Sequence, residues 1–234
     1  RYLGEALDSV ARQGVDCRVV VVDAGSDVPI ELPALPVGLS VRLKRSDAPL
    51  TAGGARNLGA ALGDSEWITF LDADDLWPDG SRKTLVEACR SAGADLAVGT
   101  VSAFHANEES RIIARPEGER TALLAGGVLL TRDAWTRVGD FDPTLKSGEF
   151  IEWYNRFTLL ELTAIENDEL ALRRRLHLES TTAAQLRDRD DYLKVVVKST
   201  AGLSAKGKLF GQLLGGTTFG LIAMHFPSTN GKTV

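Results

Sequence analysis

Four consecutive valines lie within residues 17–23, and this run is the feature that most constrains the fold. An unbroken apolar run of this kind is typical of a strand that is buried on both faces of a parallel sheet. Strand-like and helix-like segments then alternate along the chain, which predicts βαβ units. The expected helices lie at 1–13, 55–62 and 81–90, and the expected strands at 41–43, 67–71 and 96–104. We therefore expect an α/β fold with a mixed, mostly parallel sheet flanked by helices.

The pattern is less regular after residue 104. Strands are expected at 127–130 and 170–173, and helices at 133–137, 149–160 and 188–198. Beyond Ser199 the glycine, serine, threonine and lysine content argues against regular structure. Polar residues and glycines interrupt the apolar stretch at 209–226, which favours a peripheral or poorly ordered tail over a membrane span.

Length and charge narrow the class of protein. A chain of 234 residues with 44% hydrophobic content fits one domain with one core. The net charge of −5 provides no basic surface for phosphate neutralisation, so nucleic acid is not expected as a partner. Cys17 and Cys89 show neither disulfide nor metal spacing, and the chain opens without a cleavable signal. We expect a cytoplasmic location, with the C-terminal tail as a candidate contact to the inner face of the membrane.

Three carboxylates follow the expected strand 67–71, in the sequence Asp72-Ala73-Asp74-Asp75. In open α/β sheets, ligands bind at the carboxyl ends of the strands. Mg²⁺ and Mn²⁺ prefer carboxylate oxygens and keep water or substrate phosphate as further ligands. The alternative is an Asp-rich turn that only caps the next helix. Taken alone, the motif leaves both interpretations open.

Further motifs occur in a fixed order around this acidic one. They are residues 2–3, 7–10, 21–23, 55–59, 70–75, Arg132, 138–142, 148–153 and 173–177. Together they resemble the family-2 inverting glycosyltransferases, and the ordered set is more specific than any single motif. The resemblance implies a GT-A catalytic domain over 1–182, a C-terminal helix and irregular tail over 183–234, and a role in bacterial polysaccharide or cell-envelope biosynthesis.

The resemblance also implies donor-binding and metal-binding residues. Asp23, Arg56 and Asp72 would bind a nucleoside-diphosphate sugar. Asp74 and His177 would hold a Mn²⁺ or Mg²⁺ ion, for which carboxylate and neutral imidazole are suitable ligands. Such an ion would neutralise the diphosphate as it leaves.

Glu149 falls where the family places its acidic general base. It would deprotonate a hydroxyl of an acceptor that the sequence does not identify, for in-line attack on the anomeric carbon. Glu152, one helical turn further on, is the second candidate. The alternative is that both are solvated acids of an amphipathic helix, or that Glu149 stabilises the helix N-terminus.

Two departures from the family pattern keep other functions open. Ala24 stands where relatives often carry a second acid, and the strand that precedes Arg1 in relatives, in the middle of their sheet, is expected to be absent. A catalytically silent nucleotide-sugar-binding or partner-binding domain therefore remains an alternative. A nucleotidyltransferase is another, although the start of the chain lacks a Gly-rich phosphate loop with a basic residue.

Overall fold

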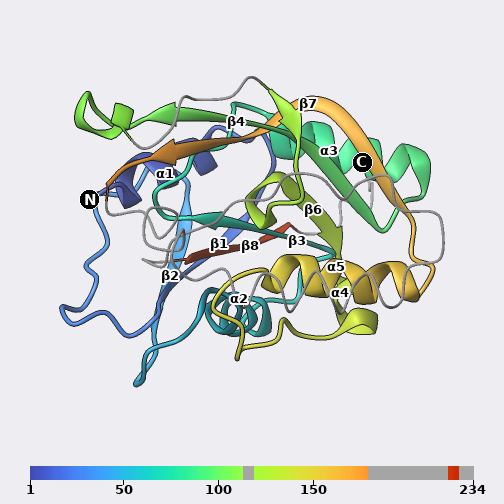
Figure 1. The fold of residues 1–234 in the computed structure, drawn as a ribbon, viewed down its shortest axis with the longest axis horizontal. Coiled ribbons are helices and arrows are strands. Elements are labelled where there is room, and N and C mark those ends of the chain that lie inside the picture. The colour runs from blue at the N-terminus through green and yellow to red at the C-terminus, as the bar shows by residue number, and fades with distance from the viewer. Residues whose placement is uncertain (113–118, 179–220, 227–234) are drawn as a thin grey trace.

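An eight-stranded sheet lies between two layers of helices in the computed structural model, which describes residues 1–112, 119–178 and 221–226 (Figure 1). The strand order is β2-β1-β8-β3-β6-β4-β5, with β7 paired to β4. Helices α1 and α3 cover one face of the sheet, and α2, α4 and α5 cover the other. The α/β class expected from the sequence is confirmed.

The strands are β1 (Arg18–Asp23), β2 (Ser40–Arg45), β3 (Trp67–Asp72), β4 (Leu96–His105), β5 (Arg120–Thr121), β6 (Val128–Thr131), β7 (Ala164–Leu176) and β8 (Leu221–Phe226). The helices are α1 (Leu3–Ala11), α2 (Ala52–Ala61), α3 (Ser81–Ala92), α4 (Arg132–Val138) and α5 (Glu149–Leu159), with 3₁₀ turns η1 (Glu109–Ile112) and η2 (Ala125–Gly127). Each expected element before residue 179 is present. Their ends are shifted by a few residues, except for β7, which is much longer than the expected strand at 170–173. The expected helix at 188–198 lies outside the described residues.

The sheet is mixed, and most of its described strands share one direction. β2 is parallel to β1, and β7 is parallel to β4. β8 runs antiparallel to both β1 and β3, and β6 runs antiparallel to both β3 and β4. Strands β1, β2, β3, β4 and β7 therefore run the same way, and their carboxyl ends meet at one edge of the sheet.

The valine run of β1 is buried on both faces, as its sequence predicts. Val19 and Val21 pack in the cluster that includes residues of α1 and α3. Val20 and Val22 pack in the cluster on the opposite face. That second cluster contains aromatic rings from β3, α4, α5 and the loop between the two helices, in stacked and edge-on contacts. Large apolar side chains on both faces thus hold the sheet between the two helical layers.

Strand β8 corrects the expectation of irregular structure throughout the segment after Ser199. Residues 221–226 form a strand in the middle of the sheet, where the sequence analysis expected a strand to be lacking. The apolar sequence of this segment suits a buried strand, and pairing on both sides satisfies backbone groups of β1 and β3 that would otherwise be buried without partners. The membrane contact expected of the tail falls largely on residues outside the described part. Among the described helices, none is both long and apolar enough to cross a membrane.

Candidate active site

Three carboxylates gather where β3 ends. Asp72 is the last residue of the strand, and Asp74 and Asp75 lie in the turn that follows, which the Asp75 N–H closes on the Asp72 carbonyl at 3.0 Å. One carboxylate oxygen from each residue lies within 4.8 Å of the others. This arrangement can hold a hard divalent cation, and the expected acidic motif is therefore assembled at the carboxyl edge of the sheet.

The carboxylates of this cluster repel one another. Burial, followed by repulsion from Asp72, raises the pKa of Asp74. Burial, followed by repulsion from Asp74 and Asp72, raises the pKa of Asp75 well above its usual range. A cation bound by the three acids would remove this repulsion, so the residues present fit a Mn²⁺ or Mg²⁺ ion.

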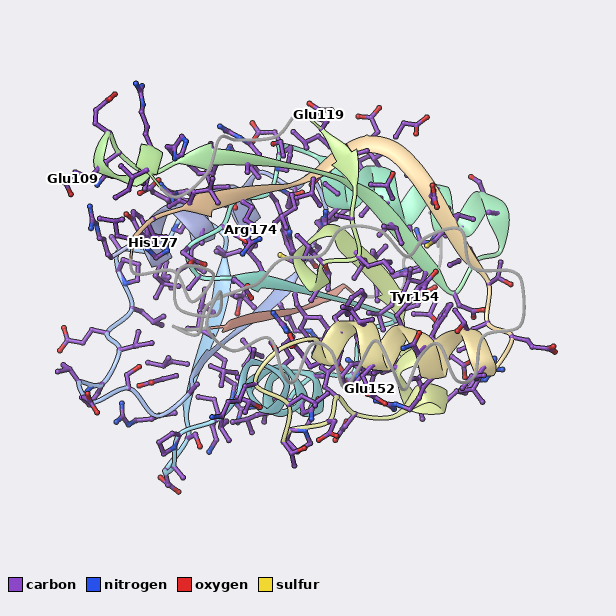
Figure 2. All side chains as sticks on the ribbon, in the orientation of Figure 1. Glu109, Glu119, Glu152, Tyr154, Arg174 and His177 are labelled. Carbon is purple, nitrogen blue, oxygen red and sulfur yellow. The ribbon has the colours of Figure 1, made fainter. Side chains whose placement is uncertain are left out.

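His177 follows β7 directly and lies at the end of that strand (Figure 2). Its Nε2 atom is 2.9 Å from the Asp74 Oδ2 atom. Its Nδ1 atom is buried and has no hydrogen-bond partner in the described part of the chain. The two residues that the family resemblance links to the metal are thus adjacent. The close group of possible metal ligands among the described residues, however, consists of Asp72, Asp74 and Asp75 and does not include His177.

Arg56 of α2 joins the acidic cluster to α5. Its Nη2 atom donates a hydrogen bond of 2.9 Å to Asp72 Oδ1, and its Nη1 atom donates to Glu149 Oε1. The Arg56 side chain is only 5% exposed. Burial lowers the pKa of Arg56, but Asp72 and Glu149 raise it more. One guanidinium therefore connects two acids that are far apart in the sequence.

Glu149 is the first residue of α5, and its position depends on the residue before it. Gly148 adopts φ 76°, a left-handed conformation that glycine tolerates without strain. This turn brings the Glu149 carboxylate to Arg56. The predicted base is thus linked through one arginine to the acidic strand end.

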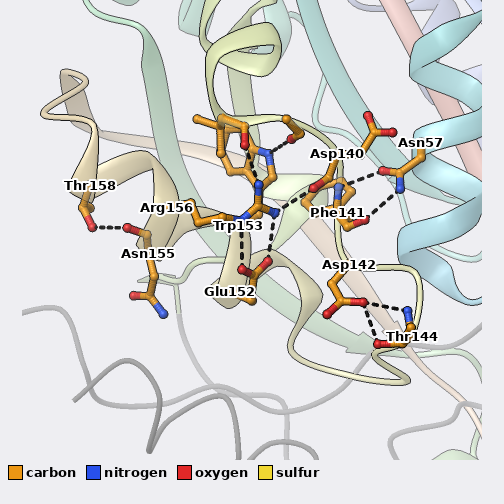
Figure 3. A network of polar contacts seen from close by, with 12 residues as sticks. Asn57, Asp140, Phe141, Asp142, Thr144, Glu152, Trp153, Asn155, Arg156 and Thr158 are labelled. Atoms are coloured by element: carbon orange, nitrogen blue, oxygen red, sulfur yellow. Dashed lines mark hydrogen bonds and ion pairs between the residues drawn. The ribbon is translucent and has the colours of Figure 1, made fainter. Parts of the chain in front are cut away.

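Glu152 contacts a different partner (Figure 3). It accepts hydrogen bonds from Arg156 Nε at 2.8 Å and Arg156 Nη2 at 2.9 Å. Arg156 also donates to the carbonyl oxygens of Val138 and Asp140. Glu152 therefore helps to fix α5 against the loop that follows α4, and this loop leads towards Glu149.

Asn57 holds the loop before α5 against α2, a contact that was not expected from the sequence. Its Nδ2 atom donates to the Phe141 carbonyl at 2.8 Å, and its Oδ1 atom accepts from the Phe141 N–H at 2.9 Å (Figure 3). The amide thus pairs with one backbone unit of the loop before α5. Its place beside Arg56 in the 55–59 motif was the only available signal, because its partner lies 84 positions away.

Asp23 lies at the end of β1, on the same edge of the sheet, but its carboxylate contacts its own loop. It accepts hydrogen bonds from the backbone N–H groups of Ser26 at 2.9 Å and Ile30 at 3.2 Å, and another from Arg45. Burial alone would raise the pKa of Asp23, but these donors lower it to about 2. The Asp23 side chain is 1% exposed, and its hydrogen bonds go to the loop after β1 and to Arg45. Within the described part of the chain, Asp23 is therefore not linked to the acidic cluster, whereas Arg56 and Glu149 are.

Two solved structures share this fold. S. aureus TarS 1-349 in complex with UDP-GlcNAc has a TM-score of 0.64 and 14% identity, over 88% of this chain and 64% of that one. The mannosyltransferase PcManGT from Pyrobaculum calidifontis, in complex with GDP-Man and Mn²⁺, has a TM-score of 0.58 and 16% identity, over 86% of this chain and 61% of that one. At these identities the likeness shows the fold alone, which is the GT-A fold of glycosyltransferases.

Curated relatives match shorter segments. The chain is 39% identical over 97 residues to the succinoglycan biosynthesis protein ExoO of Rhizobium meliloti, which covers 40% of this chain and 27% of that protein. It is 55% identical over 40 residues to a phospho-N-acetylmuramoyl-pentapeptide-transferase of Salinispora arenicola, which covers 17% of this chain and 11% of that one. The second match is too short to carry a function. This chain therefore spans about a quarter or less of the length of these two relatives.

The family follows from a sequence match over the first 143 residues. Residues 1–143 match glycosyl transferase family 2, a segment that contains β1, β3 and α2 and four members of the site, Arg56, Asp72, Asp74 and Asp75. This match covers more than half of the chain and agrees with the fold and with the order of the motifs. The chain belongs to glycosyl transferase family 2.

Proposed function

We propose that the chain transfers a sugar from a nucleoside-diphosphate sugar to a hydroxyl acceptor, with inversion at the anomeric carbon and with the help of a divalent metal. The observation that carries this proposal is the single network that runs from the acidic end of β3 through Arg56 to Glu149. It joins a metal-binding group to a candidate base at one edge of the sheet. Family membership and the nucleotide-sugar complexes of the two structural relatives support it.

In this proposal the donor lies over the carboxyl edge of the sheet. Asp72 contributes to nucleotide-sugar binding, and Arg56 belongs to the same site through its contact with Asp72. Asp74 and His177 would hold Mn²⁺ or Mg²⁺, which supplies positive charge to the departing diphosphate. Asp23 would act indirectly, because it fixes the loop that follows β1.

Glu149 would accept the proton of the acceptor hydroxyl. The hydroxyl oxygen then forms a bond to the anomeric carbon as the bond from that carbon to the diphosphate oxygen breaks, and the electron pair leaves with the diphosphate. Attack from the face opposite the leaving group inverts the configuration. Since ExoO is named for succinoglycan biosynthesis, we propose a hydroxyl of a polysaccharide or cell-envelope glycan as the acceptor.

The test is the release of nucleoside diphosphate from UDP-GlcNAc and from GDP-mannose in Mn²⁺, with water or a glycan as acceptor. Turnover is expected with at least one donor. The anomeric proton of the product, followed by NMR before mutarotation, should show a β-sugar from the α-linked donor. Retention of configuration would contradict the proposed mechanism. Donor binding without turnover would instead favour the silent-domain alternative, for which Ala24, at a position where relatives often carry a second acid, is the supporting observation.

A further inference from the structure

Arg56 is shielded from a substrate by burial, although its guanidinium has N–H groups beyond those that bond the two acids. Nη1 and Nη2 each donate to a carboxylate, and Nε is buried without a hydrogen-bond partner among the described residues. The guanidinium carbon lies 6.0 Å from the centroid of the Phe141 ring. With 5% of the side chain exposed, Arg56 presents almost no surface to a donor phosphate.

The helix that carries Arg56 is clamped to the chain that leads into Glu149. At its start, the Thr51 hydroxyl donates to the Pro143 carbonyl at 2.9 Å. One residue after Arg56, Asn57 exchanges two hydrogen bonds with the Phe141 backbone. Helix α2 and the loop before α5 therefore hold one another in a fixed relation.

The first turn of α2 also packs closely against the start of α5. A Cβ atom built on Gly53 would lie 3.2 Å from the Phe141 Cβ atom and 3.5 Å from the Glu149 Cβ atom. The start of α5 therefore lies directly against α2. In this setting the Arg56 contact can fix the direction of the Glu149 carboxylate, because both backbones are already held.

We infer that Arg56 is a positioning residue that acts through Glu149, and that it does not bind the donor directly. This inference rests on the proposed function, since it gives Arg56 a role in the step assigned to Glu149. A charge-assisted hydrogen bond from a planar guanidinium holds a carboxylate in one orientation. Asp72 depends less on Arg56, because it ends a paired strand and its carbonyl accepts the N–H of Asp75.

The experiment combines Arg56→Met, Glu149→Gln and the double variant. We measure the affinity for UDP or GDP in Mn²⁺, choosing the nucleotide that the parent binds, and the rate of diphosphate release from the matching sugar donor at saturation. Arg56→Met should lower that rate at least about tenfold while the nucleotide Kd stays within about twofold. If Arg56 acts through Glu149, the double variant should be no slower than Glu149→Gln alone.

Arg56→Lys serves as the conservative variant, and its unfolding midpoint is compared with that of Arg56→Met. Lysine keeps the charge but lacks the fork that reaches two acids, so its rate should fall between the parent and Arg56→Met. If Arg56→Met does not fold, the same cycle is run with Arg56→Lys.

Two results would overturn the inference while leaving the proposed function intact. One is a nucleotide Kd weakened about tenfold or more with the saturated rate unchanged, which would make Arg56 a donor ligand. The other is a double variant slower than Glu149→Gln by the full factor of the Arg56 substitution, which would mean that the two residues act independently. A parent that releases no diphosphate from either donor would contradict the proposed function itself, and this inference with it.

Discussion

Glu149 and Glu152 lie one turn apart on α5, yet their carboxylates have different partners. Glu149 contacts Arg56, and Glu152 contacts Arg156. The family resemblance favoured Glu149 as the base and left Glu152 as the second candidate. The structure distinguishes the two acids by their partners. The contact of Glu149 with Arg56 spans 93 positions, whereas the contact of Glu152 with Arg156 is a local i, i+4 pair. Tertiary contacts of this range are not visible in local sequence patterns.

Substitution of these two acids tests the distinction. Glu149→Gln removes the proposed base while keeping its shape, and the rate of sugar transfer at saturating donor should fall by about 10²-fold to 10⁴-fold. The matched control is Glu152→Gln, which should keep the rate within about twofold and lower the free energy of unfolding by less than about 1 kcal/mol. A slow Glu152→Gln variant with a fast Glu149→Gln variant would place the base one turn further along the helix.

Asp23 should give a pH-dependent contribution to stability. Its pKa in the folded protein is about 2, below the ordinary value of 3.8, because loop N–H groups and Arg45 bind the carboxylate. The contribution is therefore present above about pH 4 and is lost as the pH falls towards 2; its size is on the order of 2 kcal/mol. Urea unfolding of the parent and of Asp23→Asn should show a large difference at pH 7 and a smaller one at pH 2.5. An equal difference at both pH values would contradict this assignment.

At the scale of elements, alternating patterns predicted every α-helix and, except for the two-residue β5, every strand up to residue 178, because those patterns are local. Strand β7 is much longer than its expected core at 170–173, since its first half is largely exposed and lacks a buried pattern. Strand β8 was missed for another reason. Its apolar segment is short and follows a Gly-rich stretch, and only pairing with β1 and β3, at least 149 positions earlier, defines it as a strand. Its antiparallel direction also depends on those distant partners.

The role of β8 can be tested at its backbone. β1 and β3 each pair with β8, and Ala223 lies opposite both Val20 and Phe70. Ala223→Pro removes an N–H group from a central strand and should lower the free energy of unfolding by about 3 kcal/mol. Ala223→Gly keeps the N–H group and should cost only about 1 kcal/mol or less. Chemical denaturation measures the free energy of unfolding of both variants. A proline variant as stable as the parent would contradict the assignment of β8 to the folded sheet.

At the scale of the whole molecule, the site forms where the carboxyl ends of the strands meet. The sequence could predict this edge, because ligands in α/β sheets bind there and the acidic motif follows an apolar strand. The family resemblance also implied that Asp74 and His177 hold one metal, and His177 Nε2 lies 2.9 Å from Asp74 Oδ2. The sequence could not show that Arg56 would join Asp72 to Glu149, or that the Asp23 carboxylate would be taken up by its own loop.

The most direct test of the central claim is calorimetric titration of UDP and of GDP into the protein, with and without Mn²⁺. The acidic cluster at the end of β3 should bind the nucleoside diphosphate only together with the metal, because the metal relieves the repulsion between the three acids and neutralises the diphosphate. The matched control is Asp168→Asn, which removes an exposed acid of β7 away from the cluster. We predict binding in Mn²⁺ by the parent and by Asp168→Asn, and at least about tenfold weaker binding by Asp74→Asn or without metal. Equal nucleotide affinity of the parent and Asp74→Asn, or equal affinity of the parent with and without Mn²⁺, would contradict the account.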